Sequence, residues 1–272
     1  MSLITLTTDF GTKDHFIGAI KGAVYNELND ARVVDISHQI SPFNITETAY
    51  ILKNAYKNFP KGSIHIIDVD SELSIENKHI AVKLDDHYFI CANNGIMSMI
   101  ASEIKPEKIV EITIHNTLES SSAFVKVACH IARGGTLEVV GKPIQDIKQL
   151  NEVYPHINKE NNQIIGSVIY IDNYGNVISN ITKKLFQDIG KGRPFEVKAR
   201  HYTFKKIINK YNEIVNFDIP IEKRQVDGER LALFNTADYL EIAIYKSNLK
   251  SVGGASTLLG LDYRDSITVN FL

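Results

Sequence analysis

The first half of the chain alternates short apolar runs with segments whose apolar residues recur at helical spacing. Residues 3–8 (LITLTT) are apolar and β-branched, which predicts a buried strand, and residues 31–38 predict a second one. Residues 14–28 between them carry an apolar stripe with the period of a helix. Asn44 and Glu47 have the spacing of a capping box at the start of a further helix. Strands separated by helices predict an α/β domain with a mostly parallel sheet.

The pattern changes beyond the middle of the chain. Residues 149–163 are polar and have no clear period, so they are the best candidate for a linker. After them, apolar alternation returns in several short segments with little helical spacing between them, which predicts a β-rich domain. We therefore divide the chain into an α/β domain (1–145), a linker (146–164) and a smaller all-β domain (165–272).

Composition narrows the class of protein. The chain has 272 residues, of which 44% are hydrophobic and 23% charged, and this balance is typical of a soluble globular protein. A formal net charge of -2 argues against nucleic-acid binding, which needs a strongly basic face. Cys91 and Cys129 lie in apolar runs and are expected to be reduced core thiols. With neither a signal-peptide pattern nor an apolar run of membrane-spanning length, we expect a cytoplasmic protein without a membrane partner.

An acidic loop follows the predicted strand at residues 64–69. Asp68, Asp70, Glu72 and Glu76 fall within nine positions of one another. Such a loop is compatible with a metal site, a cation-binding site or a solvated turn. A divalent-metal hydrolase would use these four side chains as oxygen ligands. The sequence contains no second ligand cluster and no His or Cys metal spacing, so we expect no metal site.

Two other stretches combine residues suited to a small polar ligand. Asp9 directly follows the first strand, where ligands bind in open α/β sheets, and its carboxylate can accept two hydrogen bonds from a ribose diol. An alternative is an aspartate that only stabilises the turn. Residues 171–180 (IDNYGNVISN) place Asp172, Tyr174 and Asn176 together, which suits an aromatic base but is also compatible with a hairpin turn. The chain contains no GxSxG elbow, Walker A loop or GxGxxG motif.

Taken together, these stretches resemble one family over nearly the whole chain. They include ITLTTDFGTKDHFIGAIKG, ARVVDISHQISPFNI, FPKGSIHIIDVD, CANNGIMS, HIARG, IDNYGNVISNI and LALFNTADYLEIAI. The family is that of the S-adenosyl-L-methionine (SAM) hydroxide adenosyltransferases, which also includes the fluorinating and chlorinating SAM enzymes. The first of these stretches and the D-x-Y-G-N-x-x-S-N stretch are the most specific.

The resemblance implies an α/β N-terminal domain, a β-barrel-like C-terminal domain and a homotrimer with SAM-binding sites between subunits. It implies that SAM is a substrate and that no further cofactor is needed. Asp9 would bind the ribose hydroxyls, Asp14 the methionine ammonium, and Asp172 would lie near the methionine end. The remaining substrate-binding residues that it implies are Ser120, Asn176, Asn235 and Thr236.

The sequence departs from the family pattern at two places. The family loop D-P-G-V-G-T-x-R aligns on Asp70 with DSELSIEN, which puts Asn77 at the arginine position with Lys78 beside it. The family stretch T-F-H-G-R-D aligns with TLESSS, which puts Glu119 at the histidine position and Ser120 at the glycine position. The resemblance therefore implies Asp70, Asn77, Lys78 and Glu119 as the catalytic set.

These departures lead to two functional hypotheses. In the first, the protein is a SAM hydrolase: water displaces methionine at C5′ of the ribose, giving adenosine and L-methionine. Glu119 would act as general base and Lys78 would supply positive charge. In the second, it is a non-catalytic or altered SAM- or adenosine-binding protein. A halide would meet the negative charges of Asp70, Glu72 and Glu119, so we do not expect a halogenase.

Overall fold

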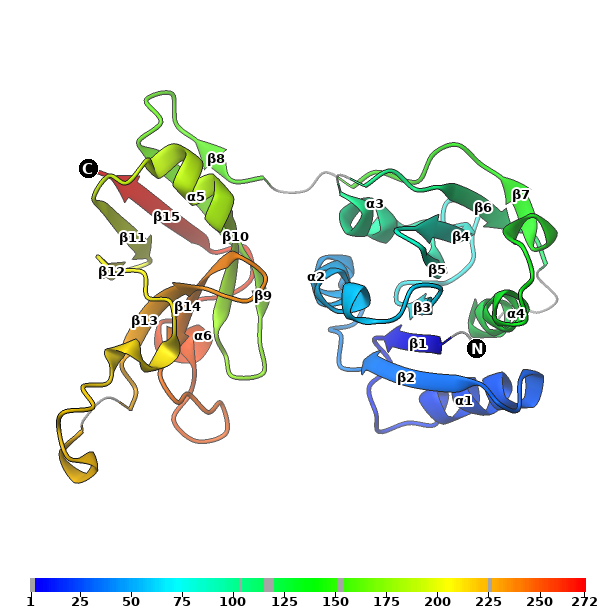
Figure 1. Ribbon diagram of the computed structural model, residues 1–272, viewed down its shortest axis with the longest axis horizontal. Coiled ribbons are helices and arrows are strands. Elements are labelled where there is room, and N and C mark those ends of the chain that lie inside the picture. Colours follow the sequence, from blue (N-terminus) through cyan, green and yellow to red (C-terminus); the bar gives the residue numbers. More distant parts are fainter. Residues whose placement is uncertain (1–2, 103, 115–119, 151–153, 225–226) are drawn as a thin grey trace. The chain divides into compact units, whose positions relative to one another are not determined.

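The structure is a computed structural model of the 272-residue chain. We describe residues 3–102, 104–114, 120–150, 154–224 and 227–272. The chain divides into two compact units, Met1–Asn151 and Glu152–Leu272, and each has its own sheet and its own buried core (Figure 1).

The first unit is built on one mixed sheet. Among the described residues the strand order is β2-β1-β3-β5-β4-β6-β7. Pairing is parallel from β2 to β5 and antiparallel from β5 to β7. The strands are β1 (Leu3–Thr8), β2 (Arg32–Ser37), β3 (Ile64–Asp68), β4 (His79–Leu84), β5 (His87–Ala92), β6 (Lys108–Ile112) and β7 (Gly141–Pro143). The predicted α/β class with a largely parallel core is confirmed.

A tight hairpin explains why the sheet becomes antiparallel beyond β5. Strands β4 and β5 are joined by Asp85 and Asp86, whose φ angles are 52° and 61°. Two consecutive positive φ angles are the mark of a type I′ turn, whose twist matches that of two antiparallel strands. The two strands therefore pair directly, without the crossover helix that a parallel pair requires.

Helices cover both faces of this sheet. They are α1 (Phe16–Glu27), α2 (Ile45–Ala55), α3 (Ile96–Ala101) and α4 (Ser120–Ala132), with short 3₁₀ turns η1 (Tyr56–Asn58) and η2 (Leu137–Val139). Helix α1 packs against α4, and α2 packs against α3. Helix α2 begins as its sequence predicts, because Asn44 Oδ1 accepts a hydrogen bond from the Glu47 amide at 3.0 Å.

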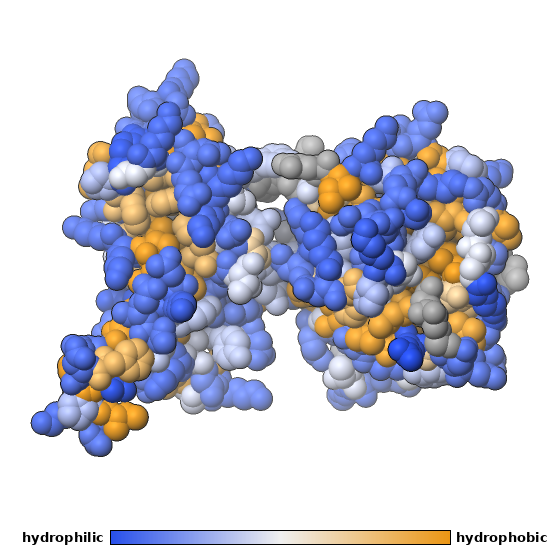
Figure 2. Space-filling model, in the orientation of Figure 1, coloured by the Kyte–Doolittle hydropathy of each residue, from blue (hydrophilic) through white to orange (hydrophobic). Residues whose placement is uncertain are grey.

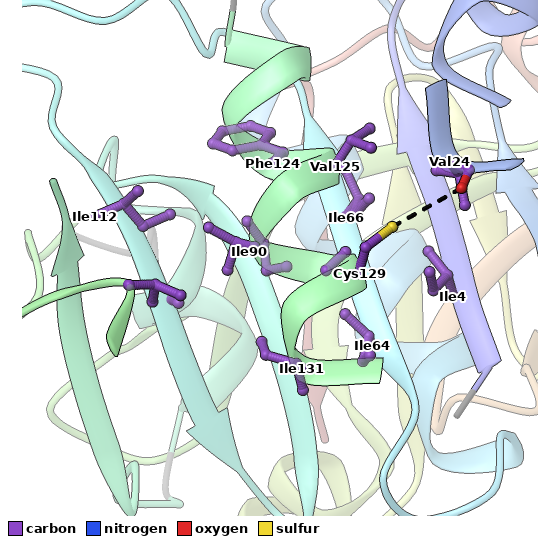
Figure 3. Close-up of a cluster of buried hydrophobic side chains, with 14 of the residues drawn as sticks. Ile4, Val24, Ile64, Ile66, Ile90, Ile112, Phe124, Val125, Cys129 and Ile131 are labelled. Carbon is purple, nitrogen blue, oxygen red and sulfur yellow. Dashed lines mark hydrogen bonds between the residues drawn. The ribbon is translucent and has the colours of Figure 1, made fainter. Parts of the chain in front are cut away.

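The buried core of the first unit follows the two-residue period of its strands. In β3, Ile66 belongs to the cluster beneath α1 and α4, whereas Ile67 belongs to the cluster beneath α2 and α3. Figure 3 shows the first of these clusters, in which Phe124 and Cys129 of α4 lie over the isoleucines of the sheet. Cys129 also approaches α1, where its Sγ lies 4.0 Å from the Val24 carbonyl oxygen. Strands β1 and β3 are therefore buried on both faces of the sheet.

The second unit is an antiparallel, nearly closed, barrel-like sheet. Its order in the described part is β12-β11-β15-β9-β10-β14-β13, and β8 pairs with β9. The strands are β8 (His156–Ile157), β9 (Gln163–Ile171), β10 (Val177–Thr182), β11 (Phe195–Ala199), β12 (Tyr202–Phe204), β13 (Arg230–Phe234), β14 (Tyr239–Ile244) and β15 (Ser266–Phe271). The predicted all-β, barrel-like class is confirmed. The linker limits 146–164 stay a prediction, and β8 and the start of β9 fall inside them.

Contacts between the two edge strands bring the second sheet close to closure. The Arg230 guanidinium of β13 lies 4.7 Å from the centre of the Tyr202 ring of β12. After β12 the chain crosses to β13, where the Ile208 amide donates to the Ala232 carbonyl at 2.9 Å. The unit also contains the helices α5 (Lys183–Gly190) and α6 (Ala255–Leu258) and the 3₁₀ turns η3 (Tyr211–Ile214) and η4 (Ile221–Lys223). Thr182 Oγ1 caps α5 by accepting from the Leu185 amide.

Figure 2 shows apolar side chains gathered on the extension that carries η3 and η4, where Phe217, Ile219 and Ile221 are exposed. No helix in the described ranges is both long enough and apolar enough to cross a membrane.

Candidate functional site

The topology of the first unit defines where a ligand binds most readily. From β1 the chain passes to β2 on one side and then returns to β3 on the other, so the order of strands reverses between β1 and β3. In open α/β sheets the crevice at the carboxyl ends of the strands, at such a switch point, is the usual ligand site. Asp9 directly follows β1, and Asp68 is the last residue of β3, where it pairs with Thr8. Both carboxylates therefore lie at the switch point.

Asp9 is held in place by the loop that precedes α2. Its Oδ2 accepts a hydrogen bond from the Phe43 amide at 2.8 Å. Asp9 is half-buried. The second oxygen, Oδ1, has acceptor capacity that suits a ligand hydroxyl. Asp14, the second predicted ligand residue of this segment, is exposed in the turn before α1.

Asp68 is the most deeply buried carboxylate of this end of the sheet, with 1% of its surface exposed. Its Oδ1 accepts a hydrogen bond from the Ser71 hydroxyl, and its Oδ2 accepts one from the Ser121 hydroxyl at 2.5 Å. Burial raises the pKa of Asp68, the charge of Asp9 adds to this increase, and the two hydroxyls oppose it. The sequence named Asp68 only as one member of the acidic loop, and the signal that identifies it as a site residue is its pairing with Thr8, the residue before Asp9.

The acidic loop after β3 is closed by amides. Asp70 has a φ of 46°, and its carbonyl oxygen accepts from Asn77 Nδ2 at 2.9 Å and from Asn94 Nδ2 at 3.2 Å. Asn77 Nδ2 also donates to the Glu72 carbonyl at 3.1 Å. The Asn77 amide therefore ties the two ends of the loop together, whereas Lys78 is exposed.

The start of α4 faces the same place. Ser121, in the first turn of this helix, is the hydroxyl that reaches Asp68. Glu119 lies outside the described residues, as does the side chain of Ser120. His79 of β4 supports this arrangement, because its Nε2 donates to the Ser71 carbonyl at 2.8 Å and its ring centre lies 4.6 Å from that of Phe124 in α4.

In the second unit, Asp172 organises the turn between β9 and β10. Its Oδ1 accepts from the amides of Tyr174 and Asn176 at 2.8 and 2.9 Å, and its Oδ2 accepts from Asn176 Nδ2 at 2.9 Å. Gly175 has a φ of 77°, and a Cβ there would lie 2.6 Å from a methyl carbon of Leu249. Asn176 Oδ1 is buried and has no hydrogen-bond partner among the described residues. This amide oxygen can therefore accept a hydrogen bond from a ligand.

A second carboxylate, Glu241 of β14, lies beside this turn and is 3% exposed. It accepts hydrogen bonds from the Tyr211 hydroxyl and from the Asn235 side chain. Burial raises the pKa of Glu241, and the charge of Asp172 raises it further. Sequence reasoning passed over Glu241, although a glutamate inside an apolar strand is an available signal for a buried polar site.

The predicted residues of the following turn are arranged around its backbone. Asn235 Oδ1 accepts from the amides of Ala237 and Tyr239 at 3.0 and 3.1 Å. This leaves its NH₂ group to donate to Glu241. Thr236, by contrast, is exposed. The structure thus brings Asp172, Asn176, Asn235 and Glu241 together in the second unit.

Hydrogen-bond acceptors dominate both clusters. Carboxylates and amide oxygens suit a ligand with hydroxyl groups, an ammonium group or a sulfonium centre. The described residues contain no group of three or more His, Cys, Asp or Glu side chains placed to hold a metal ion. Glu72 and Glu76 are exposed, and both oxygens of Asp68 already accept from serines, so these residues give the metal-hydrolase alternative no support.

The first unit is an α/β sheet with acceptor residues at its β1–β3 switch point, and the second unit is a barrel-like sheet. This is the class of architecture that the sequence resemblance predicts. The model of the SAM hydroxide adenosyltransferase N-terminal domain matches residues 4–141, and that of the C-terminal domain matches residues 166–268. The chain therefore belongs to the SAM hydroxide adenosyltransferase family, and the predicted resemblance is confirmed.

Individual relatives carry two kinds of name. The chain is 30% identical to an (R)-S-adenosyl-L-methionine hydrolase of Methanocaldococcus jannaschii, over 99% of this chain and 96% of that protein. It is 22% identical to a fluorinase of Actinopolyspora mzabensis, over 91% of this chain and 94% of that protein. It also resembles the crystal structure of an uncharacterized conserved protein from Thermotoga maritima, with a TM-score of 0.82 and 26% identity, covering 98% of this chain and 100% of that one.

Proposed function

We propose that this protein is a SAM hydrolase, in which water displaces methionine at C5′ of the ribose to give adenosine and L-methionine. The observation that carries the proposal is the 30% identity, along 99% of the chain, to a protein named as an (R)-S-adenosyl-L-methionine hydrolase. The acceptor-rich carboxyl ends of β1 and β3 support it, because they suit the ribose hydroxyls and the cationic sulfur of this substrate.

The reaction requires little covalent chemistry from the protein. The water oxygen forms a bond to C5′ while the C5′–S bond breaks, and the electron pair of that bond leaves with sulfur as neutral methionine. Sulfonium is already a good leaving group, so the tasks of the protein are alignment, removal of bulk water and acceptance of one proton from the attacking water. Negative charge around the sulfonium favours its binding and disfavours an approaching halide, so halogenation is not proposed.

Roles for individual residues follow from the resemblance and from the contacts. Asp9 holds the ribose hydroxyls through the oxygen that the Phe43 amide leaves available. The other proposed substrate-binding residues are Asp14, Ser120, Asp172, Asn176, Asn235 and Thr236. The proposed catalytic residues are Asp70, Asn77, Lys78 and Glu119. We also propose a homotrimer, which sedimentation equilibrium would test.

The function is tested by incubating the protein separately with the two sulfonium epimers of SAM and following adenosine and methionine by chromatography. We expect equal amounts of the two products and faster turnover of the (R) epimer, because the relatives carry that epimer in their names. Adenosine that does not exceed the spontaneous background with either epimer, at high protein concentration, contradicts the proposal.

A pair of aspartate variants links this activity to the switch point. Asp9→Ala removes the proposed ribose ligand, and we expect it to abolish SAM binding measured by calorimetry. Asp30→Ala removes an exposed carboxylate from the turn before β2 and should leave binding unchanged. Equal affinities of the two variants would exclude Asp9 as the ribose ligand.

One observation favours a second function, a SAM- or adenosine-binding protein without turnover. Both described hydrogen bonds of Asn77 Nδ2 go to loop carbonyls, so this side chain closes the loop and supplies no positive charge. In that case calorimetry detects saturable binding of SAM or adenosine, whereas chromatography detects no adenosine formed from SAM.

A further inference from the structure

The buried carboxylate of Asp68 accepts hydrogen bonds from two serine hydroxyls. Ser71 donates to its Oδ1, and Ser121 donates to its Oδ2 at 2.5 Å. A serine hydroxyl carries one proton and two lone pairs. When that proton is directed at Asp68, the oxygen can only accept hydrogen bonds from any third group. Asp68 therefore determines the hydrogen-bonding character of both serines.

Burial shows which of these groups can meet a ligand. Asp68 is 1% exposed, whereas Ser71 and Ser121 are both half-buried. Both serines are therefore partly accessible, whereas the carboxylate to which they donate is not. A molecule bound beside Asp9 would contact Ser121, and Asp68 would act on this molecule only through the Ser121 hydroxyl.

We propose that Asp68, acting through Ser121, orients the attacking water at the β1–β3 switch point and receives its proton, the general-base role that the first sequence hypothesis gives to Glu119. This inference rests on the proposed hydrolase function. Water donates to Ser121 Oγ, which directs a water lone pair towards C5′. As the O–C5′ bond forms and the C5′–S pair leaves with methionine, the water proton passes to Ser121 Oγ. The original Ser121 proton passes to Asp68, which later releases it to solvent.

The surroundings of Asp68 suit a group that takes up a proton transiently. Its pKa is raised by burial and by the neighbouring charge of Asp9. A base whose pKa lies nearer to the working pH drives proton transfer more effectively than an ordinary, more acidic carboxylate. Of the other titratable groups nearby, His79 in β4 donates to the Ser71 carbonyl, and Asp70 lies two residues beyond the strand. Asp68 is thus a positioning residue and proton acceptor, and Ser121 is the group that contacts the water.

The same arrangement selects against anions. A halide is bound by hydrogen-bond donors, but the protons of Ser71 and Ser121 both point to Asp68. Water can donate to these oxygens, whereas chloride or fluoride cannot. The nucleophile position is therefore specific for a neutral donor as long as Asp68 is ionised.

The test compares kcat and KM for SAM across the pH range in the wild type, Asp68→Asn and Ser121→Ala, by chromatography of adenosine. We expect Asp68→Asn to lower kcat about 100-fold with KM unchanged, and to abolish the fall of kcat at acid pH that protonation of Asp68 causes. Ser121→Ala should lower kcat with KM unchanged. Glu76→Gln, which removes an exposed carboxylate from the adjoining loop, is the matched control and should behave as the wild type.

Each outcome bears on the inference. Thermal unfolding establishes that the variants are folded, and if Asp68→Asn is not, Ser121→Ala carries the test. An unchanged kcat and pH profile in the folded variants, or an equal loss in Glu76→Gln, overturns the role of Asp68 while the hydrolase function stands. A wild type that forms no adenosine overturns the proposed function, and this inference with it.

Discussion

Three residues form a buried polar chain across the first sheet. Thr5 Oγ1 of β1 lies 2.7 Å from His65 Nδ1 of β3, and His65 Nε2 lies 3.1 Å from His87 Nδ1 of β5. The His65 ring is fully buried and stacks on Phe89, with ring centres 4.9 Å apart. Burial lowers the pKa of His65 to about 3, and the charge of His87 contributes to this shift.

This shift makes the stability of the first unit depend on pH. In the unfolded chain His65 takes up a proton below its usual pKa of 6.5, whereas in the folded unit it stays neutral until about pH 3. The free energy of unfolding of the first unit is therefore not lowered by His65 above pH 6.5, and it decreases as the pH falls from 6.5 towards 3. Each pH unit in this window costs about 1.4 kcal/mol, so the loss at about pH 4.5 is about 2.7 kcal/mol.

The assay compares the free energy of unfolding in urea at about pH 7 and pH 4.5 for the wild type and His65→Gln. Glutamine can hydrogen-bond to Thr5 and His87 but does not titrate. We expect the wild type to lose about 2.7 kcal/mol more than this variant between the two pH values. Hydrogen exchange in β3 and β5 assigns the change to the first unit.

An exposed histidine provides the control. His201→Gln, in the turn between β11 and β12, should keep the pH dependence of the wild type. If His65→Gln loses as much stability on acidification as the wild type does, the argument that buried His65 stays neutral is wrong.

Three further predictions concern packing, the ligand-binding turn and the thiols. Phe124→Ala should lower the free energy of unfolding by about 3–5 kcal/mol in calorimetry, because this fully buried ring packs between α4 and the sheet; a loss similar to that of an exposed Phe43→Ala would contradict this. Gly175→Ala should weaken SAM binding, because its φ of 77° and the nearby Leu249 oppose a Cβ; unchanged affinity in calorimetry would show that the turn is not part of the site. Cys91 and Cys129 should react with a disulfide reagent only after unfolding, because burial raises the pKa of both thiols; rapid reaction of the folded protein would refute it.

Most of the fold was predicted from local patterns of apolar and polar residues. The apolar run at residues 64–69 identified β3, and the spacing of Asn44 and Glu47 identified the start of α2. Such signals are readable from sequence because strand and helix periods depend on neighbouring residues. The antiparallel β4–β5 hairpin was not predicted, although it is also local, because its two strands are joined directly by Asp85 and Asp86.

The candidate site was predictable only where a residue directly follows a strand or forms a turn. Asp9 and Asp172 are of this kind, and both lie in the clusters that the structure assembles. The sequence signals that Glu241 is a buried polar residue, but it does not identify its partner Tyr211, which comes from a separate segment 30 residues earlier. The catalytic roles of Asp70, Asn77, Lys78 and Glu119 stay predictions.

Asp68 and Asp70 show what the sequence by itself determines about this protein and what depends on the tertiary structure. By itself the sequence determined that the chain has an α/β and an all-β part, that it resembles one family, and that an acidic loop follows β3. It placed both aspartates in that loop, and the resemblance implied a catalytic role for Asp70 alone. Only the tertiary structure showed how the surroundings of the two aspartates differ. Strand β1 places Asp9 beside Asp68, and α4 brings Ser121 to it from 53 residues away. The positive φ of Asp70, by contrast, turns the chain out of the strand. The pKa of a carboxylate depends on burial and on its neighbours in space, and segments distant in sequence supply both.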